Sequence, residues 1–129
     1  MGNAQIGLFD LADKRLQWLT ARQGVLAANV ANADTPNWSA RDVPPFAQVL
    51  SGSVAAAAGA MVQTSPMHLS GIVTGGDGEK LLRGEKAPDG NQVSLDEQME
   101  KIAQTDTDHE AVTALYLKYV GMYRTALGR

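Results

Sequence analysis

The chain has 129 residues, of which 44% are hydrophobic, and this length and composition are typical of a single globular domain. Its net charge of −3 and sequence pI near 5.2 exclude a basic field for phosphate backbones, so we expect no nucleic-acid binding. The chain holds no cysteine, which excludes disulfides and zinc–thiolate sites, and no apolar run approaches the ~18 residues of a membrane span.

The first predicted element is a helix that covers about residues 5–33. Apolar positions recur there at alternating spacings of three and four, which is typical of one face of an amphipathic helix, and Trp18 widens that face. The helix is expected to end near Asp34, because Pro36 disfavours the helical conformation of Thr35. The stripe consists of Phe9, Ala12, Leu16, Leu19, Gln23, Leu26, Val30 and Ala33.

The middle of the chain, residues 44–93, has a different composition. All five prolines lie between residues 36 and 88, and eight of the thirteen glycines lie between residues 52 and 90. Every aromatic residue, by contrast, lies in residues 1–46 or 116–129. Because prolines and glycines mark turns, we expect a loop-rich insert between two packed helical ends.

Three local elements are expected within this insert. Residues 55–62 are rich in alanine and could form a short helix, which Gly59 weakens. The short apolar pieces at residues 71–74 and 92–95 could pair as a small hairpin or lie on a sheet edge. The sequence Pro-Asp-Gly-Asn at residues 88–91 predicts a turn.

The last predicted element is a longer helix over about residues 94–128. Ser94, with Glu97 three residues later, predicts a capping box at its start. Its acidic residues precede its basic ones, which suits the helix dipole. A stripe with heptad-like spacing has three consecutive polar members, and a shifted face through Val112 and Leu115 is the alternative there. The stripe consists of Leu95, Met99, Ile102, Asp106, His109, Thr113, Tyr116, Val120, Tyr123 and Leu127.

Three tyrosines, Tyr116, Tyr119 and Tyr123, share one face of this last helix. They pack either on the first helix of the same chain or between chains, where a ring with a polar tip suits an interface, and both interpretations stay open. We expect Phe9 and Trp18 to face them. The expected assembly positions are Phe9, Leu16, Trp18, Leu19, Leu26, Val30, Met99, Ile102, Val112, Tyr116, Tyr119, Tyr123 and Leu127.

The sequence offers only weak candidates for a catalytic or metal site. Residues 106–110 hold carboxylates and His109, but a single helical turn rarely supplies a full set of metal ligands. The glycine-rich residues 75–78 lack the Lys-Ser/Thr that a nucleotide-binding loop requires. We therefore predict no enzyme, cofactor, metal or small-molecule substrate. A remote alternative is a small cell-wall hydrolase that uses His68 and His109.

The most specific motif of the chain is RQGVLAANVANADTPNWSARD at residues 22–42. It resembles the N-terminal signature of bacterial flagellar rod proteins. Residues 64–69 and 88–99, together with the C-terminal helix, are similar to those of a proximal rod subunit, so the resemblance spans nearly the whole chain. The matching residues of the first motif are Asn29, Asn32, Ala33, Asp34, Thr35, Pro36 and Trp38.

This chain departs from the family pattern at two places. It has Asn37 and Trp38 where the family usually has Gly-Tyr. Asparagine accepts positive φ more readily than other non-glycine residues, so we expect the turn to be kept, with Trp38 and Phe46 anchoring it outward. Residues 49–60 lie outside the resemblance.

The resemblance implies a structural subunit of the proximal rod, which transmits torque across the periplasm. The implied partners are copies of the chain, other rod proteins, the adaptor protein that links the rod to the membrane ring, and the flagellar type III export apparatus. Export by that route fits residues 1–30, which lack the unbroken apolar stretch of a signal peptide. The implied fold is mainly α, with residues 1–35 and 94–129 pairing as a coiled coil and residues 36–93 forming a bend and an insert with a small β element.

A second interpretation of the same stripes stays open. A secreted helical adaptor that binds one partner without polymerising would also need two amphipathic helices. The two interpretations differ in what the purified chain does. A rod subunit gains order and assembles with other rod proteins, whereas an adaptor forms a stable one-to-one complex.

Overall fold

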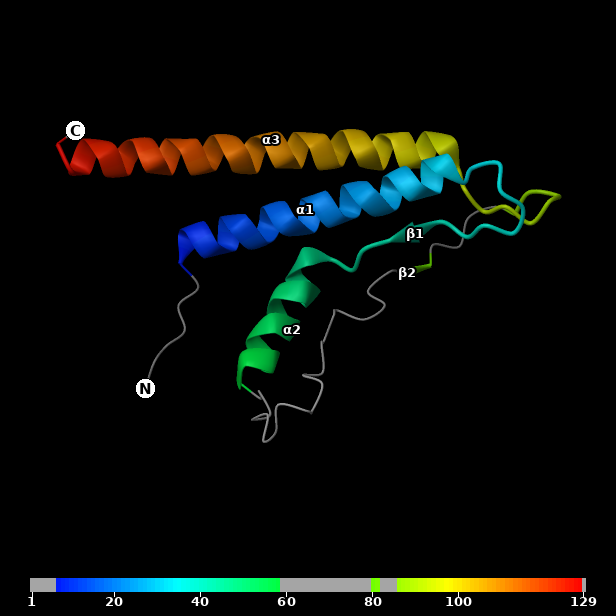
Figure 1. The fold of residues 1–129 in the computed structure, drawn as a ribbon, viewed down its shortest axis with the longest axis horizontal. Helices are drawn as coiled ribbons and strands as arrows, with labels where there is room; N and C mark the ends of the chain where they lie inside the picture. Colours follow the sequence, from blue (N-terminus) through cyan, green and yellow to red (C-terminus); the bar gives the residue numbers. More distant parts are fainter. Residues whose placement is uncertain (1–6, 59–79, 82–85, 129) are drawn as a thin grey trace, which may run out of the picture.

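Two long helices dominate the structure. A computed structural model of the chain describes residues 7–58, 80–81 and 86–128. Helix α1 spans Leu8–Ala31 and helix α3 spans Leu95–Ala126, close to the predicted bounds. They lie side by side and run in opposite directions (Figure 1). This mainly helical architecture, with the terminal helices packed on each other, confirms the predicted fold class.

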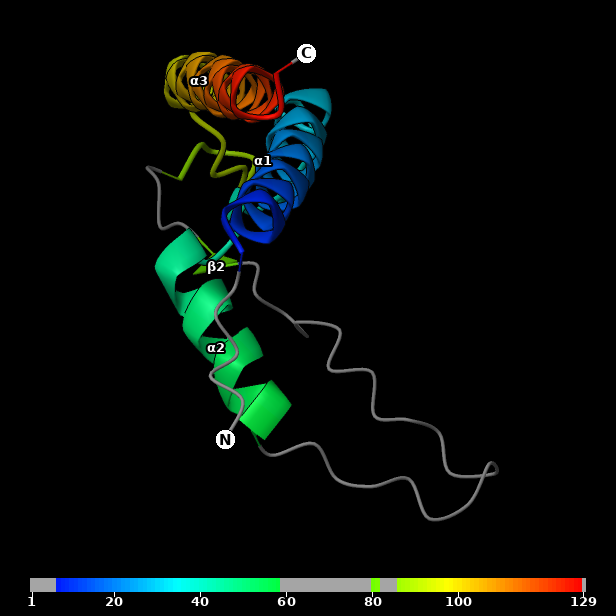
Figure 2. The same cartoon turned by 90° about the vertical axis from the view of Figure 1, so that its left-hand side faces the viewer.

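The insert contributes one helix and one short strand pair to the described residues. Helix α2, Phe46–Ala58, projects away from the two long helices, as two perpendicular views show (Figures 1 and 2). Strand β1, Arg41–Asp42, pairs antiparallel with strand β2, Lys80–Leu81. The predicted small β element is present, but the strand expected at residues 92–95 is absent, and the other expected piece, residues 71–74, lies outside the described ranges.

The expected short helix at residues 55–62 begins earlier than predicted: residues 55–58 are helical, and residues 59–62 lie outside the described ranges. Helix α2 begins at Phe46, directly after Pro45, and the described part ends at Ala58. A proline at this position suits a helix start, since its missing N–H would have no partner in the first turn. The carbonyl of Pro45 accepts hydrogen bonds from Gln48 and Val49, which closes that first turn.

The apolar stripe of α1 packs against α3 as the spacing predicted. Leu19 and Leu26 are 1% and 0% exposed, and the other members of the stripe are half-buried. Ala40 is the only further hydrophobic residue that is buried among the described residues. Full burial of a leucine contributes roughly 1.5–3 kcal/mol, so the apolar core of the described region is small.

The face that α3 turns toward α1 differs from the predicted stripe in its first half. Gln98 and Thr105 are buried there, whereas Met99, a predicted stripe member, is 49% exposed. The hydroxyl of Thr105 donates to the carbonyl of Lys101, and Gln98 has a partner in α1, so polar side chains are satisfied inside the contact. Farther along, Val112 is half-buried, as the shifted face required, but Leu115, the other residue of that face, is 49% exposed.

The start of α3 was correctly placed, but the capping box was wrong. Ser94 is the N-cap residue, yet its side chain makes no capping hydrogen bond. The Glu97 carboxylate instead accepts a hydrogen bond of 2.6 Å from the Lys101 ammonium one turn later. This pair lies on the helix surface at the spacing of four residues that favours oppositely charged side chains.

The turn after α1 and the turn before α3 are joined. Asn37 has φ of 60°, as expected for an asparagine in place of the family's glycine, and its backbone N–H donates to the carbonyl of Asp89. Gly90 has φ of 83°. A Cβ atom at Gly90 would collide with Oδ1 of Asn37. The predicted turn at residues 88–91 is therefore present and packs on the bend.

Replacing Gly90 with alanine is expected to destabilise the chain by about 1–3 kcal/mol, because the new side chain is strained at positive φ and meets Asn37. Gly24→Ala is the matched control, since a Cβ atom there meets nothing within 4 Å and α1 gains about 0.5–1 kcal/mol of helix propensity. Thermal unfolding followed by far-UV circular dichroism compares them. An equal rise in Tm for both variants would show that Gly90 is not constrained.

Candidate assembly surface

The bend is centred on one buried amide. Asn29 is 1% exposed, and its Nδ2 donates to the Arg41 carbonyl at 2.6 Å and to Oε1 of Gln98 at 2.8 Å. Its Oδ1 accepts the backbone N–H of Arg41 at 3.0 Å. One side chain thus holds α1, β1 and α3 together. This gives a structural reason for Asn29 in the family motif.

A second buried amide ties the turn after α1 to the segment before α3. Nδ2 of Asn91 donates to the carbonyls of Asn32 at 3.0 Å and Thr35 at 2.7 Å, while its Oδ1 accepts the Val93 N–H at 2.8 Å. The Asn32 side chain also accepts the Thr35 hydroxyl. The bend is therefore closed by hydrogen bonds from residues that lie far apart in the chain.

The other motif residues lie around this network. Ala33 is half-buried, while Asp34 and Pro36 are exposed. Trp38 is half-buried, its carbonyl accepts the Gln92 N–H at 2.9 Å, and its indole Nε1 is buried with no hydrogen-bond partner among the described residues. The guanidinium of Arg41 lies over the Trp38 ring, so this ring packs at the bend.

A group of charged side chains closes the same end of the helix pair. The guanidinium of Arg22 binds both carboxylate oxygens of Asp42 at 3.1 Å. The ammonium of Lys101, on α3, lies 4.0 Å from the same carboxylate. Two-pronged arginine–carboxylate contacts are stronger and more specific than single ones. Arg22 and Asp42 lie within the family motif, but sequence reasoning did not pair them, since only the bend brings them together.

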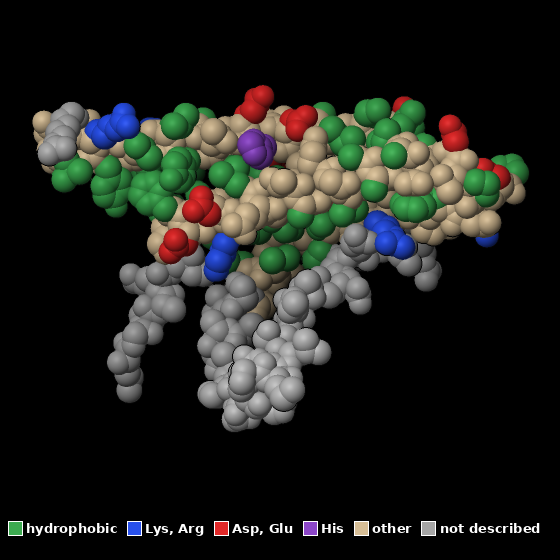
Figure 3. Space-filling view, in the orientation of Figure 1, with side chains coloured by type: hydrophobic (Ala, Val, Ile, Leu, Met, Phe, Trp, Pro, Cys, Tyr) green, Lys and Arg blue, Asp and Glu red, His purple; other side chains and the backbone are tan. Residues whose placement is uncertain are grey.

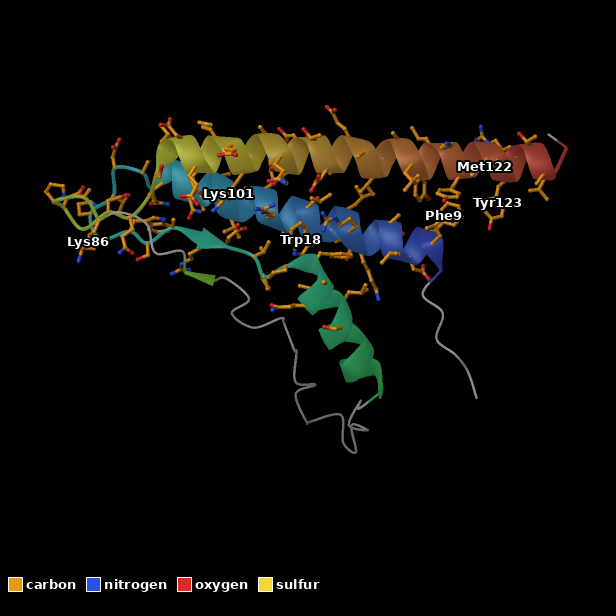
Figure 4. The ribbon with its side chains drawn as sticks, turned by 180° about the vertical axis from the view of Figure 1, so that it is seen from behind. Phe9, Trp18, Lys86, Lys101, Met122 and Tyr123 are labelled. Atoms are coloured by element: carbon orange, nitrogen blue, oxygen red, sulfur yellow. The ribbon has the colours of Figure 1, made fainter. Side chains whose placement is uncertain are left out.

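Five of the seven aromatic residues form two clusters. At the open end of the helix pair, the Phe9 ring centroid lies 5.2 Å from that of Tyr116 and 5.6 Å from that of Tyr123 (Figure 4). The first contact has the edge-on geometry that aromatic rings favour. Phe9 therefore faces the tyrosines within one chain, as expected.

Trp18 does not face the tyrosines, contrary to expectation. Its Nε1 donates to the Pro44 carbonyl at 2.8 Å, and its ring meets Phe46 edge-on at 6.0 Å. The guanidinium of Arg15 lies 4.6 Å from the Trp18 ring centroid and 5.0 Å from that of Phe46, and it also pairs with Asp108. Trp18 therefore attaches the start of α2 to α1.

The expected assembly positions differ in how much of each side chain is exposed and so available to another molecule. Leu19 and Leu26 are buried in the helix pair, whereas Met99, Tyr123 and Leu127 are exposed. Large hydrophobic side chains gather where the C-terminus of α3 lies over the start of α1 (Figure 3). The half-buried positions are Phe9, Leu16, Trp18, Val30, Ile102, Val112, Tyr116 and Tyr119. Exposed large hydrophobic residues that sequence reasoning did not assign to assembly are Leu8, Val49, Leu95, Leu115, Leu117 and Met122.

The weak sequence candidates for chemistry remain separate or outside the described ranges. His109 is exposed on α3, and within the described part of the chain no three His, Cys, Asp or Glu side chains form a group that could hold a metal ion. His68 and residues 75–78 lie outside the described residues. No described helix has the length and apolar composition needed to cross a bilayer.

Comparisons with known proteins agree on one family. A family model described as "Flagella basal body rod protein" matches residues 10–38. The flagellar basal body rod protein FlgB of Escherichia coli (strain K12) is 36% identical over 110 residues, which cover 78% of this chain and 79% of that protein. FlgB of Salmonella typhimurium (strain LT2) is 31% identical over 116 residues, 83% of each chain. FlgB of Agrobacterium fabrum is 44% identical over 64 residues, 50% of this chain and less than half, 46%, of that relative.

Proposed function

This chain belongs to the FlgB family of flagellar basal body rod proteins, and on that premise we propose that it is a subunit of the proximal rod that transmits torque across the periplasm. Residues 1–35 and 94–129 form its inner helical layer, and residues 36–93 form the bend and an outer insert. The observation that carries the proposal is that the helix pair buries few hydrophobic side chains and leaves many large ones exposed.

The chain has more exposed apolar surface than its own folding buries. Among the described residues three hydrophobic side chains are buried, while nine large ones are exposed. Contiguous exposed apolar side chains on a small protein mark contacts with other proteins. Contacts between different faces of neighbouring copies do not close on themselves, so they extend into helical assemblies such as a rod.

The proposal includes a set of partners and a location. The partners are copies of the chain, other flagellar rod proteins, the adaptor that links the rod to the membrane ring, and the type III export apparatus. The location is the rod of the basal body. The relatives are named as rod proteins, and this supports a structural role without catalysis, cofactor, small-molecule substrate or nucleic acid.

The proposal is tested with Leu127, which is 74% exposed at the end of α3. Leu127→Asp is expected to keep the helicity of the purified chain but to lower its amount in isolated basal bodies about tenfold or more, because it places a charge in the contact between subunits. Thr125→Asp, on the opposite side of α3, is the control and is expected to incorporate normally. A stable one-to-one complex with a single partner, and absence of the chain from basal bodies, would instead support the adaptor.

A further inference from the structure

A hollow of about 220 Å³ lies between α1 and α3, beside the histidine visible in Figure 3. It is rich in hydrogen-bond acceptors. The Asp106 carboxylate is exposed on its rim and accepts one hydrogen bond, from Nε2 of Gln23 at 3.1 Å. Oε1 of the same Gln23 amide is buried and has no hydrogen-bond partner among the described residues. The residues lining the hollow are Leu19, Thr20, Gln23, Thr105, Asp106 and His109.

A buried acceptor beside a carboxylate calls for a cation that donates several hydrogen bonds. An unpaired buried acceptor costs about 1–3 kcal/mol, and a guanidinium is the side chain that can serve a carboxylate and an amide oxygen together. When a cation binds the Asp106 carboxylate in place of Nε2 of Gln23, the Gln23 amide can rotate about its Cγ–Cδ bond. Oε1 can then accept a hydrogen bond from that cation.

We propose that this hollow receives the Arg124 guanidinium of a second copy of the chain, an inference that rests on the proposed rod function. Arg124 is exposed on α3 and makes no ion pair within the described ranges. The first half of α3 carries most of its acids and the last turns carry Lys118 and Arg124, so the two ends of the helix are complementary in charge.

The side chains near Arg124 match those near Asp106 in position. Residues 18 apart in an α-helix are separated by five turns of 3.6 residues, so they point in the same direction. Asp106 and Arg124 are related in this way, as are Met99 and Leu117, which are 49% and 64% exposed. We call Met99, Ala103 and Asp106 the acceptor patch, and Leu117, Gly121 and Arg124 the donor patch.

When the next copy is turned by about 180° about the direction of α3 and shifted along it by five turns, about 27 Å, the donor patch of one copy faces the acceptor patch of the other. Leu117 then lies on Met99 and Arg124 on Asp106. The small residues Ala103 and Gly121 allow the two backbones to approach closely. A contact between two copies uses the donor patch of one and the acceptor patch of the other, so each of the two copies still has one free patch. Further copies can bind there, and the assembly stays open, as a rod requires.

Cysteine cross-linking tests this register directly, since the chain contains no cysteine of its own. Cells produce two differently tagged copies, one with Met99→Cys and one with Leu117→Cys, and basal bodies are isolated after mild oxidation. A disulfide between the two tags is expected, and none between copies with the same tag. Gln104→Cys, about 140° around the helix from Met99, replaces Met99→Cys in the control and is expected to give no cross-link.

Charge reversal then tests the ion pair. Arg124→Asp on the Leu117→Cys copy is expected to lower the cross-link about fivefold or more, and Asp106→Arg on the Met99→Cys copy to restore about half of it. An unchanged yield would overturn the placement of Arg124 in the hollow, and a cross-link from Met99→Cys to a different rod protein would overturn the register, in both cases with the chain still present in basal bodies. Absence of the chain from basal bodies would instead overturn the proposed function and this inference with it.

Discussion

Leu26→Asp is expected to separate α1 from α3 and to exclude the chain from the rod. Leu26 is 0% exposed and lies in the last part of α1, which spans Leu8–Ala31. Truncating such a leucine costs about 2–5 kcal/mol, and a buried unpaired carboxylate adds several more. Small domains have roughly 5–15 kcal/mol of stability in total, and the apolar core of the described region is small. The expected result is therefore loss of the packed helix pair.

The measurements are far-UV circular dichroism of the purified chain, swimming motility, and detection of the chain in isolated basal bodies. Leu19→Asp, at the other buried leucine, is expected to give the same result. The matched control is Ala27→Asp, which introduces the same charge one residue along α1 on its exposed side and is expected to leave motility intact. Normal motility in both leucine variants would contradict the packing described here.

Asn29→Leu is expected to destabilise the chain by about 3 kcal/mol or more. The two side chains have the same branched shape and the same number of heavy atoms, so no cavity forms and the loss comes mainly from hydrogen bonds. The variant removes three hydrogen bonds, two to the Arg41 backbone and one to Oε1 of Gln98, each worth about 0.5–1.5 kcal/mol. It also leaves the buried Gln98 amide without this partner, which costs about 1–3 kcal/mol.

Urea unfolding measures this loss, and two further variants identify its cause. Asn32→Leu, at a half-buried asparagine whose bonds are local to its turn, is expected to cost about 1 kcal/mol. Adding Gln98→Leu to Asn29→Leu is expected to recover about 1 kcal/mol, since both partners are then apolar. Additive losses in the double variant would show that the two amides are not coupled.

The two long helices could be predicted from sequence because their signals are local. Leu19 and Leu26 belong to a stripe whose spacing alone defines one side of α1. Pro36 and the turn-forming residues around it predict an end near Asp34, three residues beyond Ala31, where α1 ends. Asn37 was expected to keep positive φ for an equally local reason, the conformational freedom of asparagine. Each of these properties depends on residues within a few positions of one another.

The contact face of α3 could not be predicted in the same way. Gln98 and Thr105 read as surface residues, and Met99 reads as a core residue, yet their burial is the reverse. A polar side chain is buried without penalty only where a partner meets it, and Asn29, the partner of Gln98, is distant in sequence. The same holds for Trp18, whose hydrogen bond to Pro44 depends on the path of the bend.

The sequence by itself determined the extents of α1 and α3, the turns at Asn37 and Gly90, and membership of a rod family, since periodicity, turn residues and motifs are properties of contiguous residues. Only the tertiary structure decided which side of α3 meets α1, which residues close the bend, and which apolar side chains remain exposed for assembly. Those outcomes depend on pairs of groups that are distant in the chain, and their burial is stable only when both members of a pair are in place.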